Sequence, residues 1–200
     1  MRRRIWIAAL AGFLALIWTA AAEARGGRYV FDGGTPRQQA QVRAALEVSA
    51  FNWNVVPATI TIHLRKGTDT FASKGEIWVD TTLLNSGTFA WGPIQHEYAH
   101  QVDFFLLRDD QRAQLNVVLG GKAWTQNAST AALHGPNHAS LGAERFASTL
   151  AWAYWQSDAN SLKPASKKDE SAAMAPARFR TLLEQMLRVP NPIPAVVTVG

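Results

Sequence analysis

Apolar and polar residues repeat along this chain with two different periods. Residues 58–64 and 75–80 read as β-strands, because the first segment alternates with period two and both are rich in β-branched or aromatic side chains. A shorter strand is expected over residues 28–32, and a polar loop over residues 65–74. Helices are expected over residues 35–50, 93–107, 109–119, 141–155 and 175–187. Because strands and helices are mixed without a regular βαβ alternation, the pattern predicts an α+β fold.

The first expected helix has a clear start signal. Thr35 suits the N-cap, Pro36 the first helical turn, and Gln38 the third helical position. Val42 and Leu46 then recur at helical spacing, so we expect an amphipathic helix.

The N-terminal segment has the composition of an export signal. Three arginines at positions 2–4 precede an uninterrupted apolar run over residues 5–18, and residues 22–24 have a small-x-small pattern. This order is typical of a secretory signal peptide over residues 1–24, and it predicts an exported protein, extracellular or in the cell envelope. The alternative is an uncleaved N-terminal anchor, although the apolar run is at the short end for a membrane span.

Residues 25–188 have the length of a single domain, and a proline-broken tail follows over residues 189–200. Without the signal segment the formal net charge falls from +5 to +3, because that segment carries three Arg and one Glu. This charge is mild, and no basic run is interleaved with aromatic residues, so no nucleic-acid partner is expected. A small lysine cluster is followed at once by Asp169 and Glu170, which predicts a solvated loop.

The chain has no cysteine. Disulfides and thiolate metal ligands are therefore excluded, and any transition-metal site must be built from histidines and carboxylates.

The sequence His96-Glu97-Tyr98-Ala99-His100 lies within one of the expected helices. Four residues advance an α-helix by about one turn plus ~40°, so His96 and His100 project from the same face and can reach one zinc ion. Glu97 lies beside them, where it can accept a proton from a water molecule activated by the metal. The alternative is a pair of surface histidines on an ordinary amphipathic helix.

Catalytic zinc normally has three protein ligands, so a third is required. The metzincin pattern is excluded because Asp103 and Leu106 occupy the positions of its Gly and third His. The thermolysin spacing is absent too, because residues 119–122 contain no Glu. Glu144 is the remaining candidate, early in an expected helix whose dipole stabilises a carboxylate there. An exposed Glu paired with a neighbour is the alternative interpretation.

The HEYAH sequence followed at a wide distance by Glu144-Arg145-Phe146-Ala147 resembles the gluzincin group of zincin metallopeptidases. The wide spacing is similar to that of the anthrax lethal factor catalytic domain, and the likeness covers about residues 58–155. The resemblance implies a zincin-like α+β fold, with a small mixed sheet, an edge strand over the active-site helix, and a C-terminal helical subdomain.

The same resemblance implies roles for individual residues. His96, His100 and Glu144 would bind one Zn²⁺ per chain, Glu97 would be the general base, and residues 75–80 would be the edge strand that pairs with an extended substrate. The tyrosine with which the family stabilises the oxyanion has no clear match.

Asn137 and His138 occupy the region where that tyrosine is expected, and His138 is the candidate to replace it. Asp103 shares a helical face with His96 and His100, where it could orient a ligand imidazole; a bridge to a neighbouring loop is the equal alternative. His134 and His138 could instead form a separate metal pair.

Taken together, the sequence predicts a secreted zinc metallopeptidase. It would hydrolyse peptide bonds of a peptide or protein substrate with a zinc-activated water and Glu97 as general base, without stable membrane insertion after signal cleavage. The alternatives are an exported zinc-bound binding or structural module without catalysis, and a metallohydrolase acting on another substrate such as a cell-wall peptide.

Overall fold

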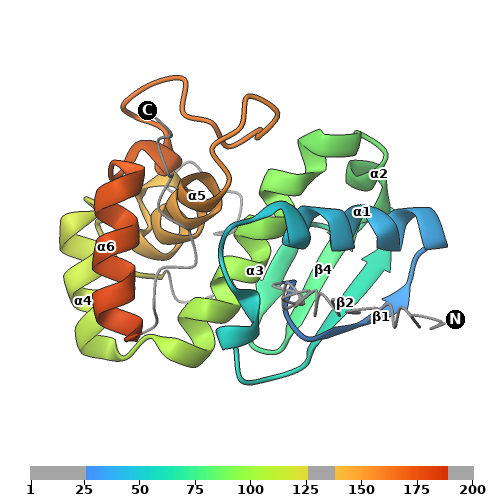
Figure 1. Cartoon of the computed structure of the whole chain (residues 1–200), viewed down its shortest axis with the longest axis horizontal. Coiled ribbons are helices and arrows are strands. Elements are labelled where there is room, and N and C mark those ends of the chain that lie inside the picture. The colour runs from blue at the N-terminus through green and yellow to red at the C-terminus, as the bar shows by residue number, and fades with distance from the viewer. Residues whose placement is uncertain (1–25, 126–137, 189–200) are drawn as a thin grey trace, which may run out of the picture.

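The computed structural model describes residues 26–125 and 138–188 (Figure 1). The expected signal peptide, residues 1–24, and the expected tail, residues 189–200, lie outside the described residues. The described chain is a mixed α+β structure with one four-stranded sheet, as predicted.

The sheet combines parallel and antiparallel strands in the order β1-β2-β4-β3. β1 (Tyr29–Gly33), β2 (Ile60–Arg65) and β4 (Glu76–Asp80) are parallel. Every boundary of these strands lies within two residues of its predicted position. β3 (Phe71–Ser73) runs antiparallel to β4 at the end of this order.

The prediction that residues 75–80 form the edge strand is wrong. β3 lies outside β4, pairing Phe71 with Trp78 and Ser73 with Glu76. The turn between the two strands has only two residues, and its second residue, Gly75, has a φ of 88°, which glycine adopts without strain. The segment expected to be a polar loop therefore contains the edge strand.

The five predicted helices are all present. Their bounds are α1 Pro36–Val48, α3 Trp91–Leu106, α4 Asp109–Val118, α5 Gly142–Tyr154 and α6 Pro176–Leu187. Shorter helical turns are α2 Thr81–Leu84, η1 Trp53–Val55, η2 Gly87–Ala90, η4 His138–Ser140 and η5 Glu170–Ala172. The start signal of α1 is confirmed: Thr35 Oγ1 accepts from the Gln38 amide, and the Gln38 side chain accepts from the Thr35 amide.

α3 runs between the two halves of the molecule. The sheet and α1 lie on one side of it, and α4, α5 and α6 lie on the other (Figure 1). Most of α3 is buried, and Tyr98, which is fully buried, packs edge-on against Trp53 and Tyr29. This burial fixes the helix that carries the HEYAH sequence within the core.

Two fully buried glutamines tie α3 to its surroundings on the sheet side. Gln95 donates to the carbonyl of Ala45 on α1 at 2.7 Å. Gln101 accepts from the amide of Gly75 and donates to the carbonyls of Ser73 and Glu76, so it binds the turn of the β3–β4 hairpin. These bonds hold α1 and the β3–β4 hairpin against α3.

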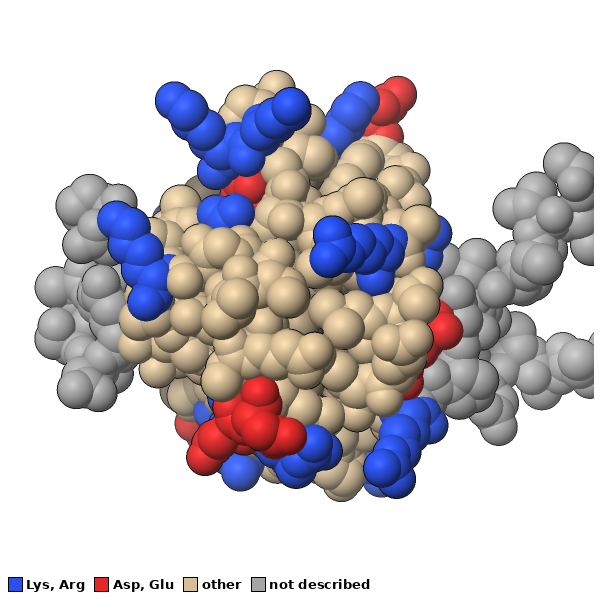
Figure 2. All heavy atoms as spheres, turned by 90° about the vertical axis from the view of Figure 1, so that its left-hand side faces the viewer, with Lys and Arg blue, Asp and Glu red and all other residues tan. Residues whose placement is uncertain are grey.

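The helical side of the molecule carries charges of both signs. In Figure 2 lysines and arginines are scattered over this face, with a small acidic group near its lower edge and uncharged surface between them. Among the described residues, no helix is long and apolar enough to cross a membrane.

Candidate metal centre

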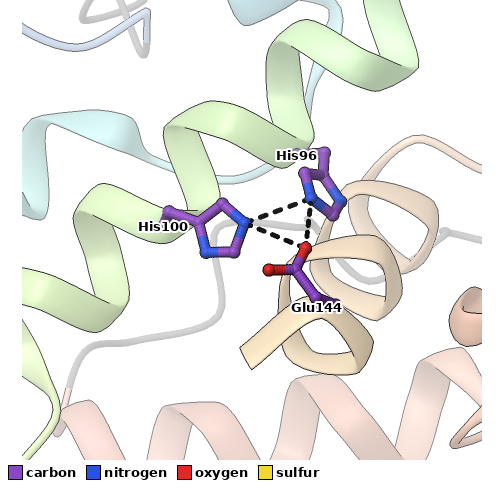
Figure 3. A group of neighbouring side chains, drawn as sticks. All are labelled: His96, His100 and Glu144. Carbon is purple, nitrogen blue, oxygen red and sulfur yellow. Dashed lines mark hydrogen bonds and ion pairs between the residues drawn. The ribbon is translucent and has the colours of Figure 1, made fainter. Parts of the chain in front are cut away.

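Three side chains from two helices converge between α3 and α5. His96 and His100 lie on successive turns of α3, and Glu144 lies in the first turn of α5 (Figure 3). α3 and α5 pack directly against each other. All three residues are buried, with at most 8 % of their surface exposed.

The spacing of the three ligand atoms fits a tetrahedral metal ion. Nε2 of His96 lies 3.1 Å from Nε2 of His100 and 3.1 Å from Oε2 of Glu144, and Nε2 of His100 lies 3.4 Å from the same oxygen. A tetrahedral zinc ion with ligands at about 2.0–2.1 Å separates its ligand atoms by about 3.3 Å. Two imidazoles and one carboxylate also form a donor set that zinc accepts. The three residues can therefore hold a metal ion.

Glu144 and the histidines of the cluster shift one another's pKa values. Burial raises the pKa of the Glu144 carboxyl, but hydrogen bonds with His100, His138 and His96 outweigh this and hold it well below its usual range. Burial lowers the pKa of His100, but the Glu144 and Glu97 carboxylates raise it by a larger amount. The pKa of His100 therefore lies above its usual value. The carboxylate is thus ionised, as a metal ligand must be.

Glu97 is buried beside this cluster. Burial raises the pKa of its carboxyl above the usual value, and the charges of His96, His100, Glu144 and His138 act on it more weakly. Its carboxylate makes no hydrogen bond to any residue in the described parts of the chain. Because burial disfavours its charged form, the Glu97 carboxylate is a stronger proton acceptor than an exposed one.

His138 reaches the centre from η4. Its Nε2 lies 3.0 Å from Oε2 of Glu144, and its Nδ1 lies 2.8 Å from Oε1 of Glu170. Hydrogen bonds to these two carboxylates raise the pKa of His138 to about 10. His138 therefore stands next to the ligand set, as the sequence suggested, whereas Asn137 and His134 lie outside the described residues.

Asp103 does not orient an imidazole. Its carboxylate is 1 % exposed and accepts hydrogen bonds from Nε of Arg112 at 2.7 Å and from Nε1 of Trp124 at 3.0 Å. The alternative left open by the sequence, a bridge to neighbouring segments, is therefore the arrangement observed. Its place on the histidine face of α3 was predicted, but its partners were not.

Ser148 and Glu170, which bind two of the imidazoles, were not predicted as part of the site. Nδ1 of His96 lies 3.0 Å from Oγ of Ser148, and this hydroxyl donates to Oε2 of Glu170 at 2.8 Å. Glu170 was assigned to a solvated loop, yet its side chain is only 19 % exposed. Ser148 could have been found from its spacing, because it lies one helical turn after Glu144 on the same face of α5. The residues around Glu170 show no spacing that would have indicated its contact with Ser148 or His138.

A hollow of about 600 Å³ opens to solvent one helical turn beyond His100. Phe104, whose ring lies 6.1 Å from that of His100, and Trp124 form apolar parts of its lining. Asp109, Arg112 and Asn116 from α4 contribute polar parts. None of the described residues that line it belongs to the group His96, His100 and Glu144, and Phe104 connects the hollow to the ring of His100.

Comparisons of the chain with protein-family models, with curated proteins and with solved structures found no match.

Proposed function

We propose that this chain is an exported, zinc-dependent metallopeptidase with a zincin-like, gluzincin-type active site. One observation carries the proposal: ligand atoms of His96, His100 and Glu144 lie 3.1–3.4 Å apart with the buried Glu97 carboxylate beside them. A site that only held a structural metal would have no use for Glu97, because that residue is not part of the ligand set.

Three protein ligands leave one position of a tetrahedral metal ion for water or substrate. Three protein ligands are typical of catalytic zinc, whereas structural zinc usually has four. Zinc bound there would supply Lewis acidity, which lowers the pKa of a water molecule and polarises a substrate carbonyl.

Glu97 is the proposed general base. Its burial and raised pKa suit a group that takes a proton from the attacking water and later delivers it to the leaving amine. The two transfers return the carboxylate to its starting state, so a single buried glutamate serves both halves of the reaction.

His138 is proposed to stabilise the negative charge that develops on the substrate carbonyl oxygen. The Glu144 and Glu170 carboxylates raise its pKa and keep its ring protonated. Glu170 holds Nδ1, so Nε2–H would be the donor to the substrate, and it becomes available when Glu144 binds the metal instead of His138. This role replaces the tyrosine of the resembled family.

β3 is the proposed binding strand for an extended substrate. It ends the order of the described sheet, and its hairpin with β4 is bound to α3 through Gln101, next to His100. An extended peptide can add to such an edge through backbone hydrogen bonds, and side-chain pockets then select among sequences. The hollow beside Phe104 and Trp124 is placed to receive one substrate side chain.

The test is turnover by the zinc-loaded chain from residue 25 onward. Hydrolysis of an unstructured protein such as casein and of a cell-wall peptide is measured for the wild type, Glu97→Gln and Glu47→Gln, an exposed glutamate on α1 that serves as control. Glu97→Gln should retain zinc and lose about 10²–10⁴-fold of the activity, and Glu47→Gln should match the wild type. A zinc-loaded wild type that cleaves neither substrate would favour a binding or structural module instead.

A further inference from the structure

Asp103 joins three segments around the candidate metal centre. It lies on α3, three residues after His100, and its buried carboxylate binds Arg112 on α4 and Trp124 in the segment that follows α4. Arg112 also donates to the backbone carbonyl of Asp103 at 2.8 Å. Hydrogen bonds to a buried carboxylate are stronger than neutral ones and fix their donors in place.

The Trp124 segment in turn holds the start of α5. The amide of Gly142 donates to the carbonyl of Ala123 at 2.7 Å, and the amide of Ala143 donates to the carbonyl of Trp124 at 3.0 Å. These are two of the amides that the first turn of a helix leaves without internal partners. The next residue in that turn is Glu144.

Residue 142 must be glycine for this contact to form. A Cβ atom there would collide with Oδ1 of Asn116 and would lie 2.8 Å from Cε3 of Trp124. The close approach of the Trp124 ring to the first residue of α5 therefore depends on a residue without a side chain. The ring of Trp124 also packs against Phe146, one turn further along α5.

We propose, on the basis of the proposed function, that Asp103 is a positioning residue that sets α5 against α3 through Trp124. The three ligands come from two helices, and Glu144 is separated from His100 by 44 positions in the sequence. A metal site tolerates errors in its ligand positions of only a few tenths of an ångström, so the two helices need a rigid link. The path Asp103–Trp124–Ala143 supplies one.

Two variants test this path. Trp124→Phe removes the Nε1–H donor and keeps an aromatic ring. Asp103→Asn removes the charge and leaves one accepting oxygen in place of two, so Arg112 and Trp124 can no longer both be bound. Zinc dissociation constants from chelator competition should rise by about 10–100-fold in each. The double variant should lose less zinc affinity than the sum of the two single losses, because both changes act on the Asp103–Trp124 contact.

A second measurement does not depend on zinc. Hydrogen exchange at the amides of Gly142 and Ala143 in the metal-free protein should accelerate about tenfold or more in both variants, while the later turns of α5 stay protected. Asp109→Asn is the matched control, because Asp109 is 99 % exposed and also binds Arg112. It should leave both the zinc affinity and the exchange rates unchanged.

The outcomes separate this role from general destabilisation and from the proposed function. Wild-type zinc affinity and exchange rates in Trp124→Phe would overturn the positioning role, and so would protection lost evenly over the whole chain. If the wild type binds no zinc, the proposed function fails, while exchange at Gly142 and Ala143 still decides whether Asp103 holds α5. If Asp103→Asn fails to fold, zinc affinity and hydrogen exchange measured on Trp124→Phe alone decide the question.

Discussion

Nε2 of His138 lies 3.0 Å from Oε2 of Glu144, the same oxygen that faces His96 and His100 at 3.1 and 3.4 Å. One carboxylate oxygen thus faces three imidazoles. His138 differs from the other two because its second nitrogen is held by Glu170. It can therefore remain next to the centre whether or not Glu144 binds a metal ion.

The metal-free chain should lose stability as the pH rises through the titration of His138. The pKa of His138 is about 10 in the folded chain and about 6.5 in an unfolded one, so its contribution is fully present below pH ~6.5 and lost towards pH ~10. Melting temperatures of wild type and His138→Gln, measured with chelator at pH 6, 8 and 10, should converge as the pH increases. A gap that stays constant over this range would show that His138 does not carry the effect.

Glu144→Ala should abolish stoichiometric zinc binding. Without this ligand only the two histidines of α3 remain, and two protein ligands do not form a stable zinc site. Elemental analysis after dialysis should give about one zinc per wild-type chain and a clear loss in the variant. Glu184→Ala on α6 is a suitable comparison, because Glu184 is not part of the ligand set. Equal zinc in wild type and Glu144→Ala would exclude Glu144 as a ligand.

Chelation should lower the melting temperature of the zinc-loaded wild type. The chain has no disulfide, and a metal that binds only the folded state stabilises it by mass action. At free zinc about 100-fold above the dissociation constant the stabilisation is about 3 kcal/mol, which corresponds to about 5–10 °C for a domain of this size. The same chelation applied to Glu144→Ala should have little effect, and an unchanged wild-type melting temperature would indicate a weak or absent site.

Substitutions of Ser148 and Glu170 should affect zinc binding and catalysis differently. Ser148→Ala removes the partner of His96 Nδ1 and should weaken zinc binding, whereas Glu170→Gln also removes the charge that keeps His138 protonated. Glu170→Gln should therefore lower kcat by about 10–100-fold beyond any change in zinc affinity. Zinc titrations and steady-state kinetics at saturating zinc distinguish the two. If both variants change only the melting temperature, the network is structural.

Local patterns were sufficient to predict the long elements and the ligand candidates. The helix that carries His96 and His100 has an uninterrupted apolar periodicity, and Glu144 begins a second helix of the same kind. The three-residue strand β3 was missed because its formation depends on pairing with β4 and on the turn at Gly75, not on its own alternation.

Long-range hydrogen bonds account for the remaining errors. Asp103 binds Trp124, 21 positions away, and Ser148 binds Glu170, 22 positions away. Such contacts depend on how the helices pack, which the residues flanking each partner do not report. The residues that could hold a metal ion were therefore predictable from the sequence. Ser148 could have been found from its spacing to Glu144, whereas Glu170 and Trp124 could not.

Gln101→Ala should weaken substrate binding, because Gln101 holds the β3–β4 hairpin against the helix that carries His96 and His100. Its side chain binds the Gly75 amide and the carbonyls of Ser73 and Glu76, so Gln101→Ala removes three hydrogen bonds between α3 and the β3–β4 hairpin. The free energy of unfolding should fall by about 1–3 kcal/mol. If β3 binds the substrate, KM should also rise several-fold with a smaller change in kcat, because zinc and Glu97 are not touched.

Gln95→Ala is the matched control for this prediction. Gln95 is also a fully buried glutamine of α3, but it binds Ala45 on α1, away from the hairpin. Both variants should lose stability by denaturant unfolding, and only Gln101→Ala should raise KM for an extended peptide substrate. An equal rise in KM for both would mean that the effect comes from a loosened α3, and β3 would then no longer be supported as the substrate-binding strand.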